Sequence, residues 1–207
     1  MFKTVAKNGT AEIVEKKSKF IANIFYIESV DEAENYIKQI NKKYFDARHN
    51  CYAFSVMTEN GIVNRFSDDG EPSGTAGGPM LNILTSQNLV NVLVIVTRYF
   101  GGILLGTGGL VKAYSSAVLE VLDTSDIVEK ELGKEVEFKV SYPDFEKFKY
   151  YLKQNIIHIV NINYGENVEV IIDISDEKLS KILKNKMELN FNIIENNIIR
   201  EKFIQVM

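Results

Sequence analysis

The sequence predicts an α+β protein built from two domains. Short runs of alternating apolar and polar residues, typical of strands, are interspersed with segments whose apolar residues recur at helical spacing. A nearly all-polar stretch at 123–134 separates two such regions. Beyond it the pattern restarts in the order β-α-β-β-α-β, which is the order of a ferredoxin-like unit. We therefore expect domains at 1–130 and 134–207, with a linker region in the polar stretch.

The first expected elements are a hairpin and a helix. Residues 10–16 and 19–27 alternate as strands, and Lys16–Lys19 closes the turn between them. The lysines of this turn could meet phosphate, although short basic turns are commonly just solvated. Ser29 and Glu32 resemble a capping box, which predicts the start of a helix. Its apolar stripe consists of Ala33, Ile37, Ile40 and Tyr44.

A second strand pair, a short helix and a buried strand follow. The pair covers 50–58 and 62–66, with a turn at Glu59-Asn60-Gly61, and the short apolar helix covers 80–86. The run VLVIV at 92–96 is continuously apolar and β-branched, which indicates a strand covered on both faces. From Leu110 apolar residues return at helical spacing, and Thr107 is the predicted N-cap of that helix.

The second region supplies the elements of the ferredoxin-like unit. Pro143 is placed to open its first helix, and Ser175 to cap its second, which carries Leu179, Ile182, Leu183 and Met187. The expected strands cover 136–142, 156–163, 168–174 and 193–204.

Composition narrows the class of protein. The net charge of −4 argues against a general nucleic-acid coat, because such a protein favours a basic face, but it allows a local basic patch. The single cysteine, Cys51, permits no internal disulfide and fits a reducing cytoplasm. No signal-peptide pattern or run of 18 apolar residues occurs, so we expect no membrane partner. Composition leaves the oligomeric state open.

Two loops carry the chemistry of the first domain. After the buried strand come Arg98, Tyr99 and Phe100, and then five glycines within nine positions, the first of them Gly101. Glycines, a following helix N-terminus and one guanidinium together form a generic anion site. Tight packing of strand against helix explains the same glycines, and both interpretations stay open. The loop lacks the lysine of a P-loop, and the third glycine of a dinucleotide fingerprint would fall at Val111.

The second loop, Ser67–Pro79, is polar and acidic. Its carboxylates Asp68, Asp69 and Glu71 could hold a hard cation or act as acid and base. Alternatively, its Asp and Ser side chains cap backbone donors. The spacing matches no EF-hand, and we predict no metal site, no cofactor and no catalytic residue. His49 and Cys51 share a strand face, but a catalytic pair faces each other across elements.

Four segments carry a family resemblance. They are KSKFI at 17–21, RHNCYA at 48–53, DDGEPSGTAGGP at 68–79 and VTRYFGGILLG at 96–106. Together they look like the hallmarks of the YigZ/IMPACT family, over about residues 15–123. The resemblance implies that the first domain has the fold of the second domain of small-subunit ribosomal protein five, which is shared with domain four of elongation factor G and with GHMP-type small-molecule kinases. It also implies a second domain similar to the ferredoxin-like C-terminal domain of elongation factor G.

The resemblance further implies a role in translation, because eukaryotic members regulate translation through protein contacts. We predict a non-enzymatic protein that binds RNA, the ribosome or a translation-regulatory protein. An enzyme acting on a small phosphorylated or anionic substrate is the alternative. We expect the two loops to share one surface. The candidate binding residues are His49, Asp68, Asp69, Glu71, Ser73, Thr75, Arg98, Tyr99, Phe100, Gly101, Gly102, Gly106 and Lys112.

Overall fold

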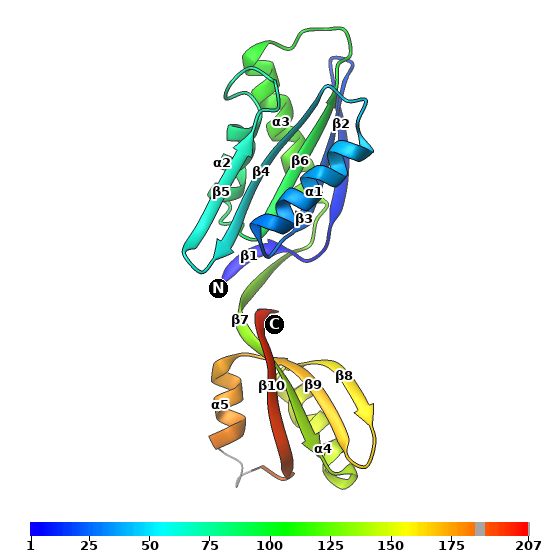
Figure 1. Cartoon of the computed structure of the whole chain (residues 1–207), viewed down its shortest axis with the longest axis vertical. Helices are drawn as coiled ribbons and strands as arrows, with labels where there is room; N and C mark the ends of the chain where they lie inside the picture. The colour runs from blue at the N-terminus through cyan, green and yellow to red at the C-terminus, as the bar shows by residue number, and fades with distance from the viewer. Residues whose placement is uncertain (185–188, 207) are drawn as a thin grey trace. The chain divides into compact units, whose positions relative to one another are not determined.

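The computed structural model of the chain describes residues 1–184 and 189–206, and those residues divide into two compact units. The N-terminal unit is Phe2–Val128 and the C-terminal unit begins at Glu129. The predicted position of Met187 in the last helix lies outside the described residues. Each unit contains an antiparallel β-sheet with helices packed on it (Figure 1). The predicted α+β class is therefore confirmed.

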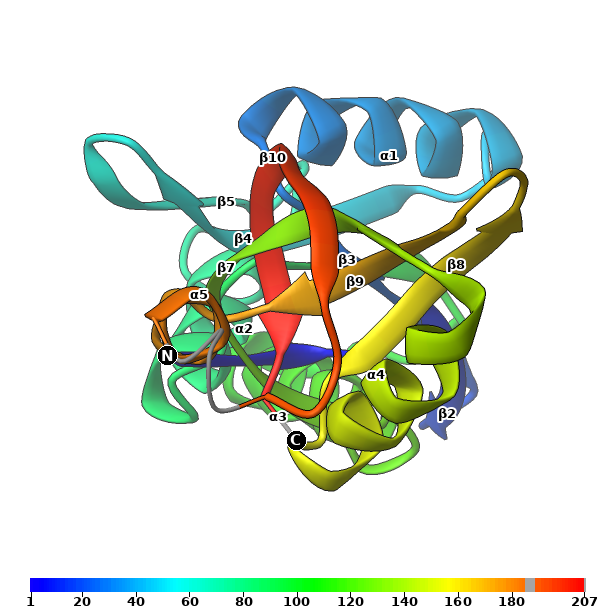
Figure 2. The same ribbon diagram turned by 90° about the horizontal axis from the view of Figure 1, so that it is seen from below.

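The N-terminal sheet has the order β2-β3-β6-β4-β5, and every neighbouring pair is antiparallel. Helix α1 covers one face, and α2 and α3 cover the other (Figure 2). The strands are β1 (Phe2–Val5), β2 (Gly9–Glu15), β3 (Ser18–Tyr26), β4 (His49–Thr58), β5 (Gly61–Ser67) and β6 (Val92–Tyr99). The helices are α1 (Val30–Lys43), α2 (Gly77–Ser86) and α3 (Gly106–Asp123).

Strand β6 forms the centre of this unit. Val92, Val94 and Val96 pack into the core under α2 and α3, whereas Leu93 and Ile95 pack into the core under α1. All five side chains are fully buried, which confirms the prediction of a strand covered on both faces. The predicted hairpin, strand pair and helices of this unit are also confirmed.

The start of α1 confirms the predicted capping box in a slightly shifted form. Ser29 Oγ accepts a hydrogen bond from the Glu32 N–H at 3.1 Å. The Glu32 carboxylate reaches back to the N–H of Glu28, at 2.7 Å, rather than to that of Ser29. Strand β1 was not expected from the sequence, because a run of four residues is too short to show a period.

The C-terminal unit has the predicted β-α-β-β-α-β order, with the strands arranged β10-β7-β9-β8 and all pairs antiparallel. This arrangement is ferredoxin-like. Its elements are β7 (Ile127–Val140), α4 (Tyr142–Gln154), β8 (His158–Tyr164), β9 (Val168–Ile174), α5 (Asp176–Lys184) and β10 (Ile193–Gln205). Phe138, Phe148 and Ile172 form the centre of its core.

The expected linker at 123–134 is wrong in one respect, because most of it has regular structure. Helix α3 continues to Asp123, and β7 begins at Ile127. The first half of β7 pairs with β10 as far as Lys130 opposite Gln205. This ribbon is largely exposed, so it needs no continuous apolar face, and its polar sequence was mistaken for a linker.

Candidate functional site

A row of three side chains crosses the N-terminal sheet where β6 ends. Arg98 on β6 is in register with Phe20 on β3 and with His49 on β4. Cross-strand partners project from the same face of a sheet, here the face under α2 and α3. The Arg98 guanidinium lies over the Phe20 ring, with 5.5 Å between Cζ and the ring centroid. The row therefore places the Arg98 guanidinium at the edge of the hydrophobic core.

Arg98 is joined to the acidic loop by a buried ion pair. Its Nη1 donates to Glu71 Oε1 at 2.6 Å, and only 8% and 3% of the two side chains are exposed. The Tyr114 hydroxyl, from α3, donates to the same oxygen at 2.8 Å. Arg98 and Glu71 are 27 positions apart in the sequence, and their contact brings the glycine-rich and acidic loops together in space, as expected.

Cys51 ends this buried polar chain. Its Sγ lies 3.3 Å from the Tyr114 hydroxyl and 3.0 Å from the backbone oxygen of Asp68. Burial, together with the negative charges of Glu71, Asp69 and Asp68, raises the pKa of the Cys51 thiol to about 12. The thiol is therefore protonated at neutral pH and is a poor nucleophile.

We expect Cys51 to resist alkylation in the folded protein. At pH 8 its thiolate fraction is on the order of 10⁻⁴, because the pKa lies about four units higher. Mass spectrometry after iodoacetamide treatment should show almost no labelling in an hour natively, and complete labelling in denaturant. Because the thiolate is the reactive form, the native rate should rise about tenfold per pH unit between pH 7 and pH 10. Native labelling within minutes at pH 8 would contradict this account.

The acidic loop uses two carboxylates to hold its own backbone. Asp68 Oδ1 accepts from the N–H groups of Ala76 and Gly77 at the start of α2, at 3.0 and 2.8 Å, while Oδ2 accepts from Gly74. Asp69 Oδ2 accepts from the N–H of Asn50 at 2.6 Å. These contacts match the capping alternative for this loop. Among residues 1–184 and 189–206, no group of three or more potential ligands could hold a metal ion.

His49 is fixed by the same loop. Its Nδ1 lies 2.7 Å from the backbone oxygen of Asp69, and a carbonyl can only accept, so Nδ1 carries the proton in this contact. The other ring nitrogen, Nε2, points towards Glu71 at 4.0 Å. Thr75 is buried nearby, and its hydroxyl donates to the backbone oxygen of Pro72, whereas Ser73 is exposed.

The glycine-rich loop packs against the β2–β3 turn. A Cβ on Gly101 would lie 2.0 Å from the backbone carbonyl of Lys17, so only glycine fits this approach. The Gly101 N–H donates to Ser18 Oγ at 3.2 Å. Gly102 has a φ of +83°, which suits glycine. The loop thus holds the exposed Lys16–Lys17 turn beside it.

The helix that follows begins earlier than expected. Gly106 is the first residue of α3 and Leu105 is its N-cap, with no side-chain capping bond. The prediction that Thr107 is the N-cap is wrong, because α3 starts at Gly106, whose φ is +69°, and Thr107 already lies inside the helix. Phe100, Ile103 and Leu104 remain exposed by 45%, 41% and 83%.

A pocket of about 270 Å³ lies where the two loops meet. It is lined by Arg48, His49, Gly70, Glu71, Pro72, Arg98, Phe100 and Leu104. The pocket thus contains cationic, anionic, aromatic and aliphatic side chains within a small volume. Four of the predicted binding residues, His49, Glu71, Arg98 and Phe100, line it together.

Other predicted residues lie away from this pocket. Tyr99 projects from the opposite face of β6, where its hydroxyl donates to Asp46 at 2.8 Å. That hydrogen bond, with Asp46 as acceptor, raises the pKa of Tyr99. Lys112 is exposed on α3 and is not one of the pocket-lining residues. The predicted binding roles of both stay predictions.

Five residues of the site are not among the predicted binding residues. Four of them line the pocket, namely Arg48, Gly70, Pro72 and Leu104, and Tyr114 anchors Glu71. For Tyr114 a signal existed, because a tyrosine on the apolar stripe of a helix needs a buried partner for its hydroxyl. Gly70 and Pro72 belong to the acidic loop, and no local pattern assigns Arg48 or Leu104 to the pocket.

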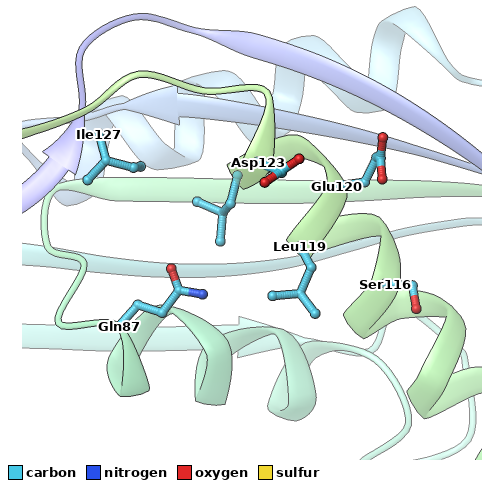
Figure 3. A pocket seen from close by; sticks show the side chains of 7 residues that line it. Gln87, Ser116, Leu119, Glu120, Asp123 and Ile127 are labelled. Carbon is cyan, nitrogen blue, oxygen red and sulfur yellow. The ribbon is translucent and has the colours of Figure 1, made fainter.

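A larger hollow of about 550 Å³ lies elsewhere in the N-terminal unit, between the end of α2 and α3 (Figure 3). It is lined by Gln87, Ser116, Leu119, Glu120, Leu122, Asp123 and Ile127. None of the predicted binding residues lines it, and its charged members are both acidic. We therefore place the candidate site at the smaller pocket, where groups of different chemistry converge.

Comparison with known proteins identifies the family. A model described as the Impact N-terminal domain matches residues 16–122, which is more than half of the chain. The chain belongs to the IMPACT family. A second model, described as a domain of unknown function (DUF1949), matches residues 138–184. The proposed resemblance is thereby confirmed.

Similar proteins match most of the chain. IMPACT family member YvyE of Bacillus subtilis is 41% identical over 166 residues, which cover 80% of this chain and 76% of that protein. An IMPACT family member of Haemophilus influenzae is 34% identical over 168 residues, covering 79% and 80%. A crystal structure of a hypothetical protein aligns with a TM-score of 0.64 at 28% identity, over 100% of this chain and 97% of that one.

Proposed function

We propose that this protein is a non-enzymatic binding protein associated with translation, which contacts RNA on or near the ribosome. Homologues in the IMPACT family are translation regulators, which supports a role in translation but does not identify the ligand. The contact is assigned to an apical surface that consists of Lys16, Lys17, Arg48, Phe100, Ile103 and Leu104. The protein would act in the cytoplasm, where its lone thiol stays reduced.

The observation that carries this proposal is the close approach of Gly101 to Lys17. It places a basic turn beside a loop with exposed aromatic and aliphatic side chains. Within residues 1–184 and 189–206, neither lysine of the turn, nor Arg48, has an ion-pair partner. Unpaired cations that flank an exposed aromatic ring are the usual platform for single-stranded nucleic acid.

The acidic loop has a supporting role in this proposal. Asp68 and Asp69 are occupied with backbone donors, and Glu71 with Arg98 and Tyr114. Arg98 therefore neutralises the charge of Glu71, whereas Asp68 and Asp69 keep their charges but have oxygens engaged by the backbone of the loop. The apical surface can be positive even though the whole chain carries a net charge of −4. No helix among the described residues is long and apolar enough to cross a membrane.

We expect salt-dependent association with single-stranded RNA and with ribosomes. The variant Lys16→Gln/Lys17→Gln/Arg48→Gln should bind a uridine dodecamer at least tenfold more weakly than the native protein at low salt. Its plot of log affinity against log salt should be flatter by about 2, since each lost phosphate contact removes about 0.7 from the slope. Fluorescence anisotropy measures the dodecamer, and co-sedimentation measures ribosomes.

The matched control is Lys38→Gln/Lys42→Gln, which removes exposed charges from α1. It should change the affinity less than twofold. If the native protein binds neither RNA nor ribosomes at low salt, or if the control weakens binding as much, the proposal is wrong. Ribosome association that survives nuclease treatment and the triple substitution would instead favour contact with a translation-regulatory protein.

A further inference from the structure

The pocket between the two loops offers both donors and acceptors to a ligand. The donors come from arginine. Arg98 is only 7% exposed and lines the pocket, and within the described part of the chain its Nε has no hydrogen-bond partner. A buried donor without a partner is costly, so Arg98 has unused hydrogen-bonding capacity beside the pocket. Arg48, on the same pocket wall, is exposed.

The acceptor is the carboxylate of Glu71. Both of its hydrogen bonds, from Arg98 and Tyr114, end on Oε1. Oε2 therefore remains as an acceptor on a residue that lines the pocket. A free carboxylate oxygen beside the ligand disfavours a phosphate group, because both groups only accept hydrogen bonds. It favours a ligand that donates N–H groups next to acceptors.

The remaining walls suit a flat ring. Phe100 keeps 45% of its surface exposed, and Pro72 and Leu104 add aliphatic surface. A volume of about 270 Å³ is below that of most drug-sized ligand pockets and is sufficient for one aromatic base. Bases of single-stranded RNA stack on such rings and are read by hydrogen bonds along their edges.

We infer that this pocket binds one unpaired guanine base, an inference that rests on the proposed RNA contact. Guanine presents O6 and N7 as acceptors, the pair that arginine reads, beside the N1–H and N2–H donors that a carboxylate accepts. Adenine carries an amino group where guanine has O6, so it places a donor opposite arginine. Uracil and cytosine lack the second ring, and they cover less of Phe100.

The test compares RNA heptamers that differ in one base. The probes are UUUGUUU, UUUAUUU and the heptamer with a central inosine, which lacks only the N2 amino group. We expect the guanine heptamer to bind at least tenfold more tightly than the adenine heptamer, with inosine between them. Arg48→Ala and Phe100→Ala should each reduce the ratio of guanine to adenine affinity to below threefold. Glu71 is avoided as a test site because its loss threatens the fold.

The control is Lys16→Gln/Lys17→Gln, which should weaken all three heptamers and leave the ratio unchanged. Equal binding of the guanine and adenine heptamers would overturn the inference and leave the proposed RNA contact standing. Preferential binding of guanosine monophosphate over adenosine monophosphate, without any RNA or ribosome binding, would support the pocket's base specificity and refute the proposed function. If neither heptamers nor mononucleotides bind, both are wrong.

Discussion

Replacing Glu71 with glutamine should cost the N-terminal unit about 3 kcal/mol of unfolding free energy, which is typical when one member of a buried ion pair is removed. The change keeps the size of the side chain but removes its charge. The Arg98 guanidinium would then be buried with one unpartnered Nε and without a carboxylate. The Tyr114 hydroxyl would also lose an ionised acceptor.

The measurement is native-state hydrogen exchange of the β6 amides in the full chain. These amides lie in the centre of the N-terminal unit, so their slowest exchange reports its global opening, separately from the other unit. The matched control is Glu12→Gln, which breaks the exposed Lys19–Glu12 pair, where the side chains are 43% and 46% exposed. That change should cost less than about 1 kcal/mol.

A combined variant tests whether the cost comes from the orphaned charge. Changing Arg98 and Glu71 to methionine and Tyr114 to phenylalanine removes all three polar groups together. Such replacements of buried polar clusters by apolar side chains are often nearly neutral. We therefore expect most of the lost stability to return. Equal costs for Glu71→Gln and Glu12→Gln would show that burial does not strengthen the pair.

The elements that the sequence predicted best are those whose pattern reflects burial directly. The run at Val92–Val96 is apolar on both faces because α1 lies on one face of β6 and the other two helices on the other. The C-terminal order was readable because its central strands, β9 and the last part of β7, alternate between buried and part-exposed residues. In both cases the local hydrophobic pattern of a strand reflects which of its faces are covered by helices distant in the sequence.

The site was harder to predict because its contacts are non-local. The sequence identifies Arg98 and Glu71 as charged loop residues, but nothing local shows that they neutralise each other. The opposite orientation of Tyr99 follows from strand alternation once β6 is known to continue past Val96. The apolar run ended at Val96, so the polar end of the strand was interpreted as loop.

The C-terminal sheet shows why composition alone cannot locate a nucleic-acid surface. Lys202 on β10 contacts Glu135 at 3.0 Å and Asp173 at 2.9 Å, and Arg200 contacts the same Glu135 at 3.3 Å. These cations are engaged by carboxylates of neighbouring strands. Lys16 and Lys17 of the β2–β3 turn have no such partners among the described residues, which is why the RNA contact is assigned to the N-terminal unit.

Gly101→Ala should be the most disruptive single-methyl change in the glycine-rich loop, with a cost of about 3 kcal/mol or more. The added Cβ would lie 2.0 Å from the Lys17 carbonyl carbon and oxygen and 2.5 Å from the Ser18 nitrogen. These are backbone atoms of a tight turn, so no side-chain rotation relieves the clash. The turn must move away, and the Lys16–Lys17 pair must move with it.

Gly108→Ala is the matched control, because its Cβ would meet nothing within 4 Å. Gly108 lies within α3, where alanine is favoured over glycine by about 1 kcal/mol, so this change should stabilise the unit. Exchange of the β6 amides measures both effects, and amide chemical shifts at Lys17 and Ser18 report displacement of the turn. If the close approach of Gly101 holds the apical surface together, Gly101→Ala must also weaken binding of the uridine dodecamer, whereas Gly108→Ala must not. If Gly101→Ala has the same unfolding free energy as Gly108→Ala and binds RNA normally, the contact between Gly101 and Lys17 does not hold the turn in place. The proposed surface would then lose its structural basis.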